Sequence, residues 1–126
     1  MRFYIAGRFH RRDEVAAMMD RVRDHGHTIT EDWTAHESLD SYADRPDRSA
    51  AYAAADIAAV EECDVFVLLA NEDGRGAHAE LGAALTSDTD AVYIIGDLRE
   101  DAMFYFHPDV ERREDIDAVL DEVDDR

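Results

Sequence analysis

The stretch CDVFVLLANEDGRGAHAELGAAL, residues 63–85, decides the predicted fold. Residues 65–69 are apolar at every position, which is typical of a strand buried on both faces of a parallel sheet. Residues 71–76 supply turn formers and two glycines, and residues 77–85 return to helical spacing. The pattern therefore predicts a buried strand, a glycine loop and a helix in succession.

Glu80 is the residue of interest in this unit, and we expect it in the first turn of the helix. Ligands of open α/β sheets bind beyond the carboxyl ends of the strands, where this turn should lie. Helix N-terminal amides favour an ionised carboxylate, and a positioned carboxylate can act as a nucleophile. An ordinary helix-terminal glutamate would give the same pattern. Gly74 and Gly76, which allow a ligand to approach the backbone closely, favour a functional role.

The remaining elements alternate around this unit. Strands are predicted at residues 2–6, 27–30 and 91–95, with a brief edge strand at 110–112, and helices at 13–25 (with Asp13 as N-cap), 49–62 and 115–123. Such alternation predicts an α/β fold: a flavodoxin- or Rossmann-like three-layer sandwich with a parallel sheet of about five strands in the order 2-1-3-4-5. With no internal repeat or composition boundary, residues 1–126 are expected to form one domain.

The composition is strongly acidic. The 126 residues include 31 acidic and 13 basic residues, all 13 of them arginine, for a formal net charge of -18. This excess disfavours nonspecific binding to nucleic acid or to anionic membranes. The acids are spread along the chain, which favours salt adaptation over an ordinary acidic protein.

Cysteine and histidine usage narrows the site types. The single cysteine, Cys63, excludes an intramolecular disulfide and a multi-cysteine metal site. The histidines are scattered, so we expect no metal site and no cofactor. The apolar runs are too short to span a bilayer and no signal-peptide pattern is visible, so we expect a cytoplasmic protein.

Asp56 is the second candidate catalytic residue. It borders the predicted apolar stripe of its helix, formed by Ala53, Ile57 and Val60. An acid at that margin needs a partner or a function, although a carboxylate that reaches solvent from an alanine-rich face is an equal alternative.

Three arginines fall within the loop RFHRR, residues 8–12, directly after the first strand. Arginine forks beside a helix N-terminus suit a phosphate group. The alternative is that they offset Asp13 and Glu14.

Three further side chains could contribute to a ligand site. His78 stands two positions before Glu80 and could touch a ligand, although a surface histidine is an equal interpretation. Trp33 and Tyr42 lie in a long polar connection and could cover a pocket edge or pack in the core.

Together these motifs resemble the nucleoside 2-deoxyribosyltransferase-like family, which includes the 2′-deoxynucleoside 5′-phosphate N-hydrolases. The resemblance covers nearly the whole chain. The segments that carry it are YIAG at 4–7, HTITEDW at 27–33 with His36 and Glu37, Asp56 through CDVFV at 63–67, and Gly74 through ELG at 80–82.

The resemblance implies a role for each matching residue. Glu80 would be the nucleophile that attacks the anomeric carbon, Asp56 would orient it and assist departure of the base, and Tyr4 would lie near the nucleophile. It also implies a small-molecule nucleoside or nucleotide partner and a homodimer in which the neighbouring subunit contributes to the site. Together with the loops above, the residues expected at the substrate are Gly7, Arg8, Phe9, Arg11, Arg12, Trp33, Gly74, Gly76 and His78.

The expected function is cleavage of the N-glycosidic bond of a (deoxy)nucleoside or its 5′-monophosphate through a covalent glycosyl-glutamate intermediate, which passes to water or another base. Two departures leave the substrate open: the hydrolases carry a serine where Asp73 or Gly74 stands here, and the C-terminal element of the transferases is not recognisable. The alternatives are a nucleotide-binding or sensing domain of the same fold without turnover, and an NAD-cleaving domain.

Overall fold

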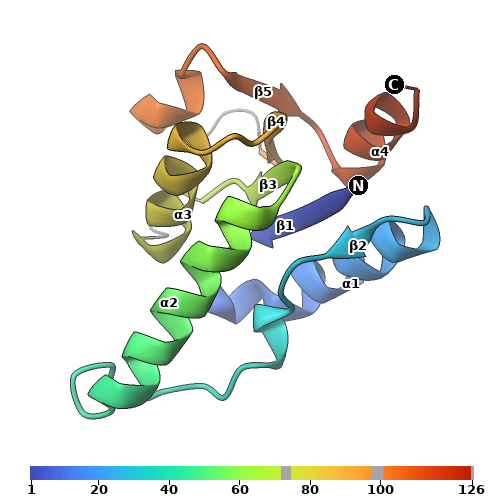
Figure 1. Cartoon of the computed structure of the whole chain (residues 1–126). Helices are drawn as coiled ribbons and strands as arrows, with labels where there is room; N and C mark the ends of the chain where they lie inside the picture. Colours follow the sequence, from blue (N-terminus) through green and yellow to red (C-terminus); the bar gives the residue numbers. More distant parts are fainter. Residues whose placement is uncertain (72–74, 98–100, 126) are drawn as a thin grey trace.

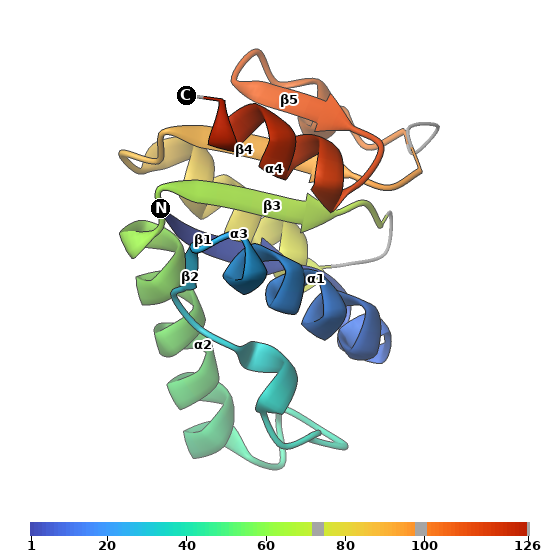
Figure 2. The same ribbon diagram turned by 90° about the vertical axis from the view of Figure 1, so that its right-hand side faces the viewer.

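The computed structural model describes residues 1–71, 75–97 and 101–125. Within these residues, five strands form one parallel sheet in the order β2-β1-β3-β4-β5 (Figures 1 and 2). This finding confirms the predicted class and strand order. The strands are β1 Arg2–Ala6, β2 Thr28–Ile29, β3 Val65–Leu69, β4 Ala91–Ile95 and β5 Val110–Arg113.

Helices cover both faces of the sheet and complete three layers. One face carries α1 (Arg12–Asp24) and α4 (Ile116–Asp124), and the other carries α2 (Pro46–Glu62) and α3 (Arg75–Thr86), as Figures 1 and 2 show. Three short 3-10 helices lie in the connections: η1 Phe9–Arg11, η2 Trp33–Ala35 and η3 Met103–Phe106.

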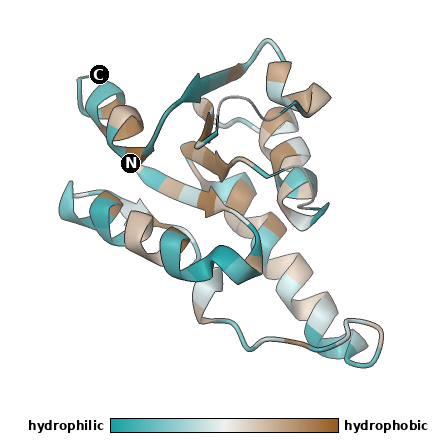
Figure 3. Cartoon of the chain, turned by 180° about the vertical axis from the view of Figure 1, so that it is seen from behind, coloured by the Kyte–Doolittle hydropathy of each residue, from teal (hydrophilic) through white to brown (hydrophobic). Residues whose placement is uncertain are grey.

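The core follows from the strand sequences. Every residue of β3 and β4 is buried, as expected for apolar strands covered on both faces. Strand β5, with the sequence VERR, is only partly buried, in keeping with an edge strand, and Figure 3 shows it as largely hydrophilic. In the part of the chain that the structure describes, no helix combines the length and apolarity needed to cross a membrane.

The predicted starts of α1, α2 and α3 are wrong. Helix α2 begins at Pro46, three residues before the predicted start. Helix α1 begins at Arg12, directly after η1, so Asp13 lies inside its first turn and is not its N-cap. Helix α3 begins at Arg75, two residues before the predicted start, so Glu80 lies in the second turn. Gly76 therefore lies within the helix. A glycine there costs the helix only about 1 kcal/mol relative to alanine, which the packing can offset.

The stripe predicted on α2 is buried only at its C-terminal end. Val60 is fully buried, whereas Ile57 is partly exposed and Ala53 is exposed. The N-terminal half of α2 extends past the sheet (Figure 1), and Ala53 and Ile57 line a cavity there instead of packing in the core. This overhang makes α2 one wall of a cavity.

Candidate active site

A cavity of about 840 Å³ lies between α2, the start of α3 and the loop that follows β1. Asp56 and Glu80 both line it, with Gly7 at the carboxyl end of β1. The order in which successive strands are added to the sheet reverses between β1 and β3, the position at which open α/β sheets bind ligands. The structure thus brings the two predicted acids to one ligand-sized space.

Glu80 is half-buried, and its pKa is unusually high for a carboxyl group. Burial raises its pKa to about 7, a nearby Tyr4 hydroxyl opposes this rise, and the charge of Glu31 adds to it. The expected stabilisation of the ionised form by first-turn amides is therefore wrong, because Glu80 lies one turn further along. At neutral pH, Glu80 exists in both protonation states.

Tyr4 lies on β1 with a fully buried side chain. Burial and the negative charges of Glu80 and Asp56 raise its pKa, so the phenol keeps its proton and remains a donor. Among the described residues, its hydroxyl has no hydrogen bond of ordinary geometry, but it lies near enough to Glu80 to lower the pKa of that carboxyl.

Asp56 has the higher pKa of the two acids. Burial raises it to about 8, helped by a hydrogen bond with Glu31 and by the charges of Glu80 and Glu31. Asp56 is thus mainly protonated at neutral pH. Two neighbouring carboxyls whose pKa values differ are the usual arrangement for an acid and a nucleophile in one site.

Glu31 and His36 are site residues for which the sequence predicted no role. The Nε2 atom of His36 lies 3.1 Å from Oε1 of Glu31, and the imidazole stacks on Tyr52 with ring centroids 4.2 Å apart. One ligand atom each from Glu31, His36 and Asp56 lies within 4.8 Å of the others, so they are near enough to share a cation. A protonated Asp56 would have to release its proton to bind one.

The arginine loop divides into one cavity residue and two structural ones. Arg8 lines the cavity. Arg11 instead pairs with Glu14 at 2.9 Å, and Arg12 lies over the Phe9 ring at 4.7 Å. Neither of these two is part of the cavity wall, so their expected substrate contacts are not supported, whereas the pairing of Arg11 with Glu14 matches the alternative considered above.

Arg75 is a cavity residue that the sequence did not predict. It stands at the first position of α3, beside Gly76, which also lines the cavity. Its position was hidden because the two glycines of the segment favoured a loop there. Two cations, Arg8 and Arg75, therefore line a cavity that also holds the two acids.

Of the other predicted substrate residues, Gly7, Phe9 and Trp33 line the cavity, and so does the exposed Tyr42. The Trp33 indole donates to the Ile5 carbonyl at 2.6 Å, which ties the segment after β2 to β1. Gly7 packs tightly, because a Cβ at its position would lie 3.0 Å from Val15. Gly74 lies outside the described residues.

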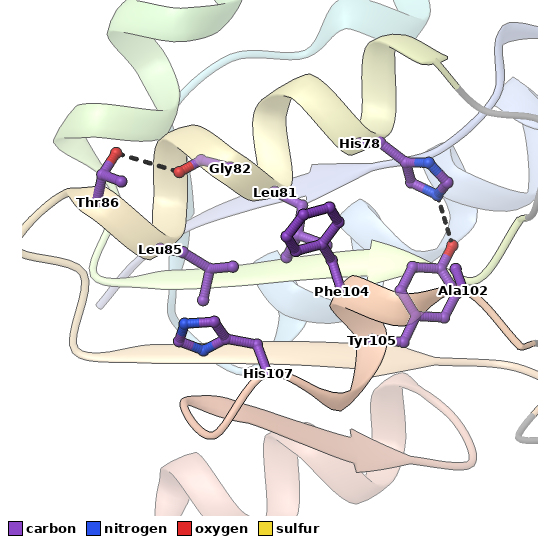
Figure 4. A pocket seen from close by; sticks show the side chains of 9 residues that line it. All are labelled: His78, Leu81, Gly82, Leu85, Thr86, Ala102, Phe104, Tyr105 and His107. Atoms are coloured by element: carbon purple, nitrogen blue, oxygen red, sulfur yellow. Dashed lines mark hydrogen bonds between the residues drawn. The ribbon is translucent and has the colours of Figure 1, made fainter.

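His78 does not face this cavity. Its Nε2 atom lies 3.0 Å from the Tyr105 hydroxyl, and it lines a separate hollow of about 320 Å³ between α3 and η3 (Figure 4). The cavity lining therefore does not support the predicted substrate contact by His78, since residues two apart on a helix point in different directions. Because the Tyr105 hydroxyl also bonds the Asn71 backbone, His78 helps to join η3 to the end of β3.

Comparisons with known proteins give structural matches only. The sequence matches no protein-family model and no curated protein. One solved structure with the same fold is a 2-deoxyribosyltransferase from the psychrotolerant bacterium Bacillus psychrosaccharolyticus, with 20% identity, a TM-score of 0.68, and coverage of 95% of this chain and 90% of that chain. Another is the Clostridium botulinum CMP N-glycosidase BcmB, with 16% identity, a TM-score of 0.59, and coverage of 98% and 99%. At these identities, the likeness supports the predicted fold, and both neighbours are enzymes.

The raised pKa of Glu80 predicts a pH-dependent stability effect. Between its ordinary value of 4.5 and about 7, the unfolded chain releases this proton while the folded chain keeps it, so rising pH weakens the fold. Glu80→Gln removes the titration and should raise the free energy of unfolding by on the order of 2 kcal/mol at pH 8, and by much less at pH 5. Denaturant unfolding at constant salt measures both values. Glu62→Gln, an exposed change on α2, is the matched control, and equal effects of Glu80→Gln at the two pH values would contradict the prediction.

Proposed function

We propose that this chain cleaves the N-glycosidic bond of a nucleoside or its 5′-monophosphate, with Glu80 as the nucleophile. The observation that carries this proposal is the convergence of Glu80, Asp56 and Tyr4 at one end of β1, two of them lining the cavity and the third acting on the Glu80 carboxyl. The two neighbours of the same fold, a 2-deoxyribosyltransferase and a CMP N-glycosidase, support the same class of reaction.

The chemistry proceeds in two steps. The ionised Glu80 carboxylate attacks the anomeric carbon, the carbon–nitrogen bond breaks with its electron pair on the base, and Asp56 donates a proton to that base. The resulting sugar ester on Glu80 is then attacked by water or by a second base, and the proton released by the attacker returns to Asp56. Tyr4 stays protonated and close enough to influence the Glu80 carboxyl, so it would donate to the carboxylate as the reaction begins and orient the oxygen that attacks.

The required protonation states overlap around neutral pH. Glu80 has to be ionised and Asp56 protonated, and their pKa values of about 7 and about 8 make this the favoured state between those values. The two groups interact, so the pair titrates as a unit.

Arg8 and Arg75 favour a substrate that carries a phosphate. Both line the cavity, and Arg75 opens α3, where the helix N-terminus also attracts an anion. In a chain with a net charge of -18, such cations reduce the repulsion that a nucleotide would meet. We therefore favour a 5′-monophosphate over a free nucleoside.

Release of free base tests the proposed function. Purified protein in high KCl is incubated with ribo- and deoxyribonucleoside 5′-monophosphates, and the base is separated by chromatography. Glu80→Gln should lower the rate about a thousandfold or more, as loss of a nucleophile does, whereas Glu62→Gln should leave it unchanged. Tight nucleotide binding without any base release would instead favour a sensing domain, and equal release by wild type and Glu80→Gln would reject the proposed nucleophile.

The same assay tests the phosphate handle. Arg8→Gln should raise KM for the monophosphate by roughly 10- to 100-fold, the value of a lost charged hydrogen bond, and leave cleavage of the free nucleoside unaffected. Arg23→Gln, an exposed change on α1, serves as the matched control. Equal losses with both substrates would show that Arg8 supports the fold and not the phosphate.

We also propose that the protein works as a homodimer. Its apolar side chains Met103, Phe104 and Phe106 are 75%, 60% and 60% exposed, and exposed apolar groups that lie together mark interaction surfaces. Light scattering during size-exclusion chromatography should give twice the chain mass of 14.2 kDa. A single-chain mass at the same salt concentration would contradict the dimer.

A further inference from the structure

Glu31 and Asp56 present two carboxyl groups to one another beside the proposed nucleophile. Oε2 of Glu31 and Oδ1 of Asp56 are both buried, and neither has a hydrogen-bond partner within the described part of the chain. One carboxyl oxygen of each residue lies within 4.8 Å of the other. Ionised carboxylates only accept hydrogen bonds, so two of them would repel here, whereas one shared proton satisfies both.

His36 is the hydrogen-bond partner of Glu31. Its Nε2 atom contacts Oε1 of Glu31 at 3.1 Å, and the ring is held by its stack on Tyr52, with an interplanar angle of 10°. The Tyr52 hydroxyl accepts a hydrogen bond from the Glu37 backbone at 3.2 Å, which fixes the stack. A donor at Nε2 stabilises the Glu31 carboxylate and leaves the proton to Asp56.

We propose that Glu31 and His36 are positioning residues that hold a proton on Asp56, so that Asp56 meets the departing base as an acid. The chemical meaning of this assignment rests on the proposed function. The Asp56 O–H bond breaks as the base nitrogen takes the proton, and the Asp56 carboxylate regains a proton from the attacking water or base in the second step.

The arrangement also times the proton transfer. Before the attack, the ionised Glu80 helps to keep the Asp56 proton in place, because its negative charge raises the pKa of Asp56. Formation of the sugar ester makes Glu80 neutral and removes that charge. Asp56 therefore becomes the stronger acid as the base leaves, and the number of negative charges in the cluster stays constant.

The titratable groups around Asp56 come from three other segments of the fold. Glu31 and His36 follow β2, Tyr4 lies on β1 and Glu80 lies on α3. Arg8 and Arg75 line the same cavity. Of these groups, Glu31 is the one whose hydrogen bond contributes to the raised pKa of Asp56.

Carbon-13 NMR of the aspartate and glutamate side-chain carboxyls tests the assignment without needing turnover. The Asp56 signal is identified by its loss in Asp56→Asn. It should titrate at about 8 in the wild type and at least roughly one pH unit lower in Glu31→Gln, where the like charge is gone and an amide can donate. Glu62→Gln should not move it.

A second variant separates proton placement from simple structural damage. His36→Phe keeps a ring against Tyr52 but removes the nitrogen that contacts Glu31, so the Asp56 signal should titrate lower than in the wild type. In Glu31→Gln, the alkaline limb of kcat/KM for base release should shift down with the Asp56 titration.

The outcomes distinguish this inference from the proposed function. Asp56 titrating among the ordinary carboxyls, or unmoved by Glu31→Gln, overturns the proton-holding role even if base is released. A titration near 8 that moves in both variants supports the role even if no base is released, in which case the proposed function alone fails.

Discussion

The parallel pairing of β1 with β3 is the interaction on which the site depends. It sets Tyr4 beside Phe66, with their rings stacked at 2° and 6.0 Å. Because β2, β1 and β3 are parallel neighbours, the segment after β2 and the helix after β3 leave the sheet at the same end, on either side of β1. Residues distant in sequence therefore influence one another's pKa at this end of the sheet: Tyr4, Glu31 and Glu80.

Burial of these acids gives the site its chemistry. A carboxyl group removed from water resists ionisation, and close carboxyls resist it further. Glu80 and Asp56 consequently titrate near neutral pH and not near pH 4, and the fold loses stability to hold them ionised. The Trp33 indole bond to Ile5 contributes by fixing the segment that carries Glu31 and His36 against β1.

Much of this arrangement could be predicted from the sequence. Residues 65–69 and 91–95 are apolar throughout, and burial on both faces is the state that such runs favour. Alternation of strands and helices predicted the parallel sheet, and the strand order was the common one for a chain of this size. Asp56 was found because it borders an apolar stripe. Its fuller setting was not, since that stripe faces a cavity and not the sheet over much of α2.

The incorrect predictions have local physical causes. Glycine spacing suggested a loop where α3 already begins, which misplaced Glu80 by one turn and hid Arg75. Nearness in sequence grouped Arg11 and Arg12 with Arg8, although Glu14 and the Phe9 ring hold them elsewhere. Glu31 and His36 lie in an irregular connection without periodicity, so only the tertiary structure reveals that they meet Asp56.

We propose that Glu80 forms a covalent bond to the sugar. A nucleoside 5′-monophosphate with fluorine at C2′ slows both steps of such a reaction, because the transition states carry positive charge on the sugar, and it can trap the ester. Mass spectrometry of the intact protein and of its peptides would measure the adduct. The peptide that contains Glu80 should gain a mass equal to the fluorosugar phosphate. The Glu80→Gln protein should show no such adduct. Base release accompanied by no adduct, or by an adduct on another residue, would contradict this proposal.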